Sequence, residues 1–177
     1  MMITIDGGTG KIMHNGLNVA AAPMVDNWYV NAQLQPGNGT NTITDNWERG
    51  TSSQFGSIGS AMTQSSGIFT FPSTGIYYCS LNGSYYRGSG HRRYVGFKIS
   101  TTENNSSFTD AVVNYDSISG DTTDNVYAAI SVTFVFDVVN TSTHKMRFRT
   151  EANDSGTTIT DTGGRYLNVV FMRMGDT

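Results

Sequence analysis

Charged side chains, proline and cysteine are all scarce in this chain of 177 residues. Asp, Glu, Lys and Arg make up 14% of the residues, against about 25% in a typical globular protein. This scarcity excludes a coiled coil or a helical bundle. The single cysteine, Cys79, excludes an internal disulfide and a cysteine metal cluster. It lies in an alternating segment, so we expect a small, buried, hydrophobic side chain.

Long apolar runs and excess positive charge are also missing. No run approaches the ~18 apolar residues that a membrane helix needs, and the first nine residues lack the cationic start and apolar stretch of a secretion signal. The net charge is -3, without the basic stripe that nucleic-acid binders carry. We therefore expect no membrane insertion, no nucleic-acid partner, and synthesis in a cytoplasm without an export signal.

Small polar residues dominate instead. Gly, Ser, Thr and Asn together make up about 43% of the chain, a composition typical of many turns. The 37% of hydrophobic residues and the low net charge exclude intrinsic disorder. The length suits one folded domain.

Eight segments with alternating or continuous apolar residues predict strands, and turns rich in Gly, Ser, Asn, Asp and Thr separate them. The predicted strands are Trp28–Leu34, Ile68–Phe71, Gly75–Tyr86, Arg93–Thr101, Ala111–Ser117, Val126–Val139, Lys145–Thr150 and Tyr166–Met174. No amphipathic helix interrupts them. The pattern predicts an all-β antiparallel sandwich or jelly roll over residues 25–177. Residues 1–24 are too short to bury a core, and we expect them to form an arm for docking or trimerisation.

The last predicted strand is apolar on both faces. Leu167, Val169 and Phe171 share one face, and Val170, Met172 and Met174 share the other. One face of a small sandwich should be wet, so the second apolar face needs a cover. We expect another copy of the chain to cover it; the N-terminal segment folding over it is the alternative. The expected interface residues are Tyr78, Val170, Met172 and Met174.

One motif carries a family resemblance. The segment Gly67-Ile68-Phe69-Thr70-Phe71-Pro72-Ser73-Thr74-Gly75-Ile76-Tyr77 places two Phe on one strand face, a turn, and a Tyr entering the core. It resembles the G-x-F-T-x-P-x-x-G-x-Y segment of the complement component 1q and tumour necrosis factor-like jelly-roll superfamily. Val135–Phe148 is similar to the penultimate hairpin of phage and marine bacterial members, and Tyr166–Gly175 to their closing strand.

The resemblance implies ten strands in two sheets and a homotrimer around a threefold axis. Cys79 and Leu81 depart from the family pattern, because aromatic residues usually stand there, and Met62 stands near an expected aromatic or Leu. The substitutions preserve hydrophobicity. No collagen-like repeat precedes the domain.

The N-terminal residues add a second resemblance. Ile3–Gly7 followed by Gly10–Ile12 is similar to the openings of phage tail-fibre and other virion proteins. We therefore expect a homotrimeric virion protein, assembled in the host cytoplasm and exposed on the particle surface. It would be a tail-fibre or receptor-binding head that contacts a host glycan or protein, with other virion proteins bound through residues 1–24. The alternative is a capsid decoration or head fibre. A cellular adhesin or signalling ligand would need an export route.

Catalytic signatures are missing. Gly7–Ile12 fails as a phosphate loop, because Ile5 and Ile12 stand at its required Gly and Ser or Thr positions. The three histidines lie in separate segments, and no Gly-x-Ser-x-Gly elbow is present. We expect no enzyme activity.

One loop has the oxygen ligands that calcium prefers. Asp121 and Asp124 lie in Ser119–Asn125 among hydroxyl and amide side chains. The loop lacks the spacing of an EF-hand, and such residues more often bond to their own turn. Calcium is the one cofactor that we consider; otherwise we expect none.

The segment Arg87–Arg93 is a concentrated positive patch. It supplies Arg87, His91, Arg92 and Arg93, and Tyr86 and Tyr94 flank it. Cations beside flat aromatic faces predict a site for an anionic sugar or carboxylate. The alternative is that these arginines pair with acidic residues of a neighbouring subunit or are solvated in a loop.

Overall fold

The computed structural model describes residues 3–5, 12–14, 17–18, 23–88, 90–121, 123–156, 159 and 165–177, with side chains from residue 23 onward. These residues form strands without a helix that is long and apolar enough to span a membrane. The strands are β1 (Ile3–Ile5), β2 (Ile12–His14), β3 (Leu17–Asn18), β4 (Met24–Val30), β5 (Gly39–Thr42), β6 (Trp47–Arg49), β7 (Thr63–Ser65), β8 (Ile68–Thr70), β9 (Gly75–Arg87), β10 (Arg92–Thr102), β11 (Thr109–Ile118), β12 (Val126–Val138), β13 (Lys145–Ala152) and β14 (Leu167–Gly175).

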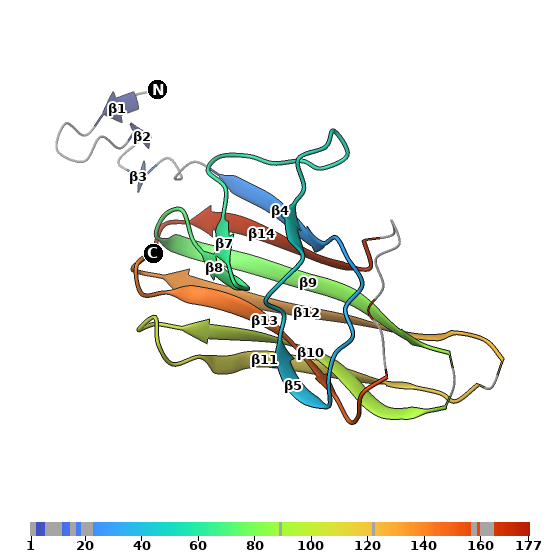
Figure 1. Ribbon diagram of the computed structural model, residues 1–177. Coiled ribbons are helices and arrows are strands. Elements are labelled where there is room, and N and C mark those ends of the chain that lie inside the picture. Colours follow the sequence, from blue (N-terminus) through green and yellow to red (C-terminus); the bar gives the residue numbers. More distant parts are fainter. Residues whose placement is uncertain are drawn as a thin grey trace.

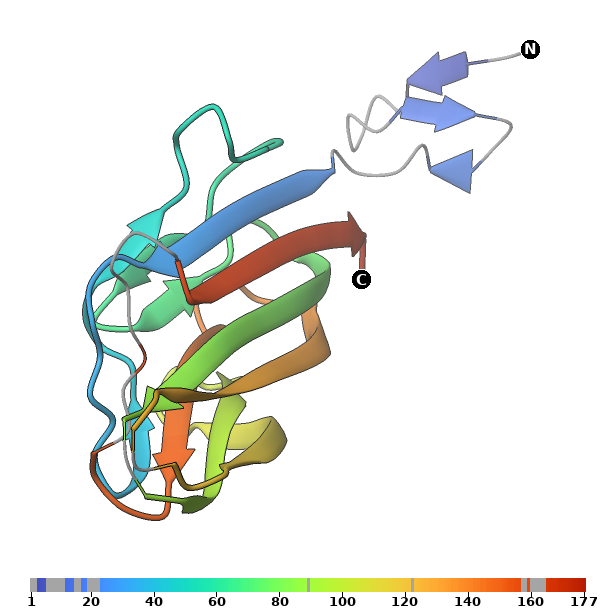
Figure 2. The same cartoon turned by 90° about the vertical axis from the view of Figure 1, so that its right-hand side faces the viewer.

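Two antiparallel sheets form a sandwich (Figures 1 and 2). The β13 sheet has the order β11-β10-β13-β8-β7, and β5 also pairs with β13. The β14 sheet has the order β12-β9-β14-β4-β6. Strands β1, β2 and β3 form a separate three-stranded sheet. The prediction of an all-β antiparallel jelly roll is confirmed.

Seven of the eight predicted strands match β8 to β14 to within two residues at each end. The prediction for the first strand was wrong in position. Strand β4 runs from Met24 to Val30, because Met24 and Val25 pair with Arg173 and Met172 of β14. Beyond Val30 the chain leaves the sheet, and Leu34 makes only an isolated bridge. Met24, which the sequence placed in the arm, therefore belongs to the sandwich.

Alternate residues of β9 enter the core as predicted. Tyr77, Cys79, Leu81 and Tyr85 are fully buried. Burial raises the pKa of the Cys79 thiol, so the side chain stays neutral.

The motif Gly67–Tyr77 supplies the centre of the core. The ring centroid of Phe69 lies 5.2 Å from those of Trp47 and Phe148 and 5.3 Å from that of Phe171. These contacts join β6 and β14 of one sheet to β8 and β13 of the other. Aromatic pairs at such distances contribute about 0.5–1.5 kcal/mol each beyond their buried area. At the turn, the Tyr77 hydroxyl donates to the Ser73 carbonyl at 2.9 Å.

Candidate functional site

The outward face of the β14 sheet exposes an apolar row. Val135, Tyr78, Met172 and Val25 are neighbours in register across β12, β9, β14 and β4. Val135 is 54% exposed and Met172 is 36% exposed. Met174, further along β14, is 66% exposed. The structure therefore brings Tyr78 and Met172 of the predicted interface together and leaves Met174 open to solvent.

A groove runs along the apolar end of this face. Its volume is about 570 Å³, and its lining residues are Pro23, Met24, Val25, Tyr78, Met172, Arg173 and Met174. Val170, the fourth predicted interface residue, is half-buried in the next row, opposite Ser80.

Further from this end the face becomes polar. Ser131, Asn82 and Asn168 form one row, and the Ser131 hydroxyl donates to Asn82 Oδ1 at 2.7 Å. At the opposite end Tyr86 lies beside Tyr127, with 5.8 Å between the ring centroids. The face can bind an apolar surface at one end while hydrogen bonding in its middle.

Two arginines of the predicted basic patch form ion pairs and hydrogen bonds with residues of the same chain. Arg92 is only 7% exposed, and its Nε lies 2.5 Å from Asp154 Oδ1. Its Nη2 donates to the Ser155 carbonyl at 3.1 Å. Arg87 Nη1 lies 3.7 Å from the same Asp154 oxygen and donates to the Gly156 carbonyl at 3.3 Å. These arginines tie the β9–β10 loop to the residues after β13.

The remaining residues of the patch lie on strands of both sheets and in the loop between β9 and β10. His91 and Arg93 are exposed, and Arg93 Cζ lies 5.2 Å from the ring centroid of Tyr94. Tyr94 packs edge-on against Tyr115 of β11, whereas Tyr86 belongs to the face of the β14 sheet. The structure therefore brings Arg93 and Tyr94 together but separates them from Tyr86.

The predicted calcium loop forms a local turn. Asp121 Oδ1 accepts hydrogen bonds from the Thr123 amide at 2.7 Å and from the Asp124 amide at 3.1 Å. Among the residues that the structure describes, no three His, Cys, Asp or Glu side chains gather to hold a metal.

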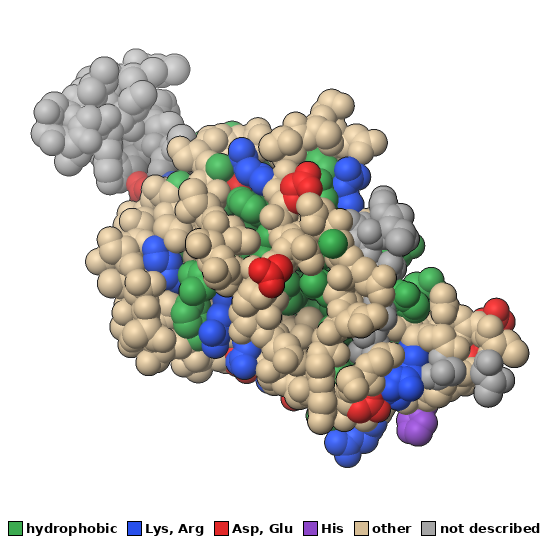
Figure 3. Space-filling model, in the orientation of Figure 1, with side chains coloured by type: hydrophobic (Ala, Val, Ile, Leu, Met, Phe, Trp, Pro, Cys, Tyr) green, Lys and Arg blue, Asp and Glu red, His purple; other side chains and the backbone are tan. Residues whose placement is uncertain are grey.

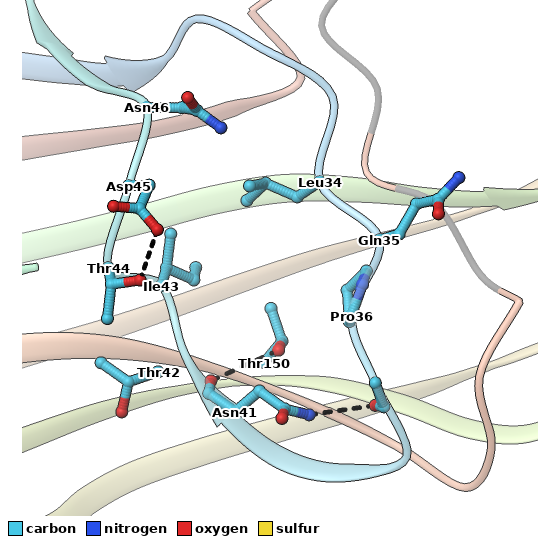
Figure 4. Close-up of a pocket in the computed structure, with 11 residues that line it drawn as sticks. Leu34, Gln35, Pro36, Asn41, Thr42, Ile43, Thr44, Asp45, Asn46 and Thr150 are labelled. Carbon is cyan, nitrogen blue, oxygen red and sulfur yellow. Dashed lines mark hydrogen bonds between the residues drawn. The ribbon is translucent and has the colours of Figure 1, made fainter.

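A polar pocket beside β5 was not expected from the sequence (Figure 4). Its volume is about 210 Å³, and its lining includes Leu34, Asn41, Ile43, Asp45 and Thr150. Asn41 Nδ2 donates to the Gly37 carbonyl at 3.0 Å, and the Thr44 hydroxyl donates to Asp45 Oδ2 at 2.7 Å. Much of the polar lining thus bonds to its own loop.

A charged cluster on the outward face of the β13 sheet was also missed. Asp110 lies 3.2 Å from Lys98 Nζ and 2.8 Å from Arg149 Nη1, and it accepts the Ser100 hydroxyl at 2.6 Å. Burial opposes ionisation, but these hydrogen bonds outweigh it and lower the pKa of Asp110 to about 2. Lys98 also lies 2.5 Å from Glu151 Oε2. The alternation of Lys145, Arg147, Arg149 and Glu151 along β13 was the available signal, because alternate residues of a strand share a face.

Comparisons with known proteins place the fold. No protein-family model matches the chain, and no curated protein matches its sequence. Solved structures do match it. Eiger TNF from S. frugiperda matches with a TM-score of 0.60 and 12% identity, over 89% of this chain and 96% of that one. Murine APRIL at pH 8.0 matches with a TM-score of 0.55 and 11% identity, over 86% and 99%. Murine APRIL at pH 5.0 gives 0.54 and 14% over the same shares.

Identities this low concern the fold alone, and the match covers most of the chain. Together with the two antiparallel sheets and the Gly67–Tyr77 turn into the core, they show that the chain has the tumour necrosis factor-like jelly-roll fold.

Proposed function

We propose that the protein is a non-enzymatic homotrimer that forms the exposed head of a bacteriophage virion protein and contacts the host cell surface. The observation that carries the trimer is the apolar row Val135, Tyr78, Met172 and Val25 at one end of the β14 sheet face. Large apolar side chains left in water favour association, at about 25 cal/mol for each Å² that becomes buried. None of these four side chains is charged, so burying them removes no charge of their own from water.

The virion assignment is supported by the sequence. Ile3–Gly7 and Gly10–Ile12 are similar to the openings of virion proteins, and Val135–Phe148 to a hairpin of phage members of the superfamily. We assign residues 1–24 to anchoring on another virion protein, apart from Met24, which starts β4. The pairing of β1, β2 and β3 with one another supports a separate anchoring unit.

The separate sheet of β1, β2 and β3 also supports one alternative function, a capsid decoration or head-fibre protein that is anchored to the shell. The two functions differ in copy number, because a shell carries hundreds of decorating subunits and a tail carries a few tens.

Purified particles distinguish these functions. Antibody labelling followed by electron microscopy is expected to place the protein on the tail, and quantitative mass spectrometry is expected to give a few tens of copies. Label on the capsid with hundreds of copies would support the decoration function. Particles that lack the protein would contradict both.

A further inference from the structure

The outward face of the β13 sheet holds more positive than negative charge. Lys98, Lys145, Arg147 and Arg149 lie on it with two carboxylates, Asp110 and Glu151. Lys98 and Arg149 pair with these carboxylates, as described above. The surplus therefore falls on Lys145 and Arg147, which are two residues apart on β13 and so about 7 Å apart along one face.

Neither of these two side chains has a carboxylate partner among the residues described. Lys145 is 9% exposed, and its Nζ donates to the Thr141 carbonyl at 2.7 Å and to the Thr70 hydroxyl at 3.1 Å. Arg147 is half-buried, with its Cζ 4.3 Å from the ring centroid of Phe108. Its Nε is buried without a hydrogen-bond partner in the described part of the chain.

Withdrawing a cation from water without a counter-ion has a free-energy cost. Burial and the neighbouring Arg149 lower the pKa of Arg147, against the opposing effect of Asp110. Burial also lowers the pKa of Lys145. An anion that reaches this face would offset both costs, and a guanidinium can hold a sulfate or carboxylate through two parallel hydrogen bonds.

The surroundings suit an extended ligand with many hydroxyl groups. In register, Lys145 neighbours Thr70 and then Thr63, and Arg147 neighbours Ile68 and then Ser65. Thr63 and Ser65 are exposed on β7, so their hydroxyls are available to a ligand that lies across the strands. Figure 3 shows basic and hydrophobic side chains next to one another on this open face.

We propose that Arg147 and Lys145 bind the sulfate or carboxylate groups of an acidic polysaccharide on the outward face of the β13 sheet, beside Phe108. That this polysaccharide belongs to the host surface rests on the proposed function, whereas the binding of an acidic polysaccharide does not. This site is distinct from Arg87 and Arg92, whose guanidinium groups lie beside Asp154.

The test measures binding of the full chain to dextran sulfate, polygalacturonate and uncharged dextran by biolayer interferometry, at about 50 mM salt to limit screening. The wild type is expected to bind at least one charged polymer and not the neutral one. Arg147→Gln is expected to weaken binding at least tenfold, about 1.4 kcal/mol. Arg93→Gln, the control, removes an equal charge from an exposed position near the start of β10 and is expected to change binding less than about twofold.

Three results overturn the inference: equal binding of charged and neutral dextran, wild-type affinity in Arg147→Gln, or an equal loss in Arg93→Gln. If Arg147→Gln does not fold, Lys145→Met is measured in the same way, and wild-type affinity in that variant also overturns it. The polymer that binds identifies sulfate or carboxylate as the ligand group. Antibody labelling of particles tests the proposed function separately. If the protein binds the polysaccharide but is absent from particles, the proposed function is contradicted and the binding inference is not.

Discussion

Asp110 shows how single side chains fix one sheet of the sandwich. It lies in β11 and accepts hydrogen bonds from Ser100 of β10 and Arg149 of β13. One carboxylate thereby ties three adjacent strands together. Its contribution to stability depends on charge, because charge-assisted hydrogen bonds are about twice as strong as neutral ones.

This contribution should disappear in acid. The pKa of Asp110 is about 2 in the folded protein, below the 3.8 of an unperturbed Asp. Its ionised form therefore stabilises the fold above about pH 4, and the stabilisation is lost as the pH falls toward about 2. Asp110→Asn should be less stable than the wild type near neutral pH, and the difference should close across this window. Urea unfolding over a pH series measures it.

The matched control is Asp116→Asn, which changes an exposed carboxylate of the same strand. Its stability difference from the wild type is expected to be small at every pH. A difference between Asp110→Asn and the wild type that persists unchanged at about pH 2 would contradict the role given to the carboxylate.

Among the elements, β9 connects the two sheets of the sandwich through its inward face. Gly83 lies on this face, and a Cβ at that position would lie 2.6 Å from the Phe97 ring and 2.7 Å from Leu167 Cδ1. Phe97 belongs to β10 of the opposite sheet. The missing side chain thus lets the two sheets approach each other here.

Gly83→Ala is expected to destabilise the fold by about 1–3 kcal/mol, as overpacking of a core does. Gly56→Ala is the control, because a Cβ there has nothing within 4 Å; it should change stability by less than about 0.5 kcal/mol. Thermal unfolding of both variants measures the effect. Equal stability of the two variants would show that the packing around Gly83 relaxes.

The sequence pattern predicted those strands in which apolar and polar residues alternate strongly. The buried face Tyr77, Cys79, Leu81 and Tyr85 of β9 could be named from the sequence, since alternation fixes the face of a strand. The short strand Gly39–Thr42 could not, because it has no apolar alternation and is defined by its pairing with β13.

The sites were harder to predict, because they depend on residues that are far apart in the sequence and that only the fold brings together. Asp154 neutralises Arg87 and Arg92 from more than sixty positions away, and only the fold brings them together. The apolar face of β14 was visible, because Val170, Met172 and Met174 alternate within one strand. The charged residues of β13 also alternate, but the pairing of Arg149 with Asp110 requires the register of β11 on β10.

In the whole molecule, the few charged residues are unevenly distributed between the two sheets. Three ion pairs lie together on the outward face of the β13 sheet, whereas the row Val135, Tyr78, Met172 and Val25 on the β14 sheet is apolar. We propose different contacts for the two faces, a charged ligand for the first and further copies of the chain for the second. A trimer through the β14 sheet would leave the β13 sheet outward, where it could reach a surface.

The mass of the protein in solution tests the trimer most directly. Sedimentation equilibrium is expected to give about 58 kDa for the wild type, three times the 19.2 kDa of one chain. Met172→Asp places a charge in the apolar row and should give 19.2 kDa. Val113→Asp, the control, changes an exposed residue of the other sheet and should leave the trimer intact. A wild-type mass of 19.2 kDa, or a Met172→Asp variant that remains trimeric, would contradict the account.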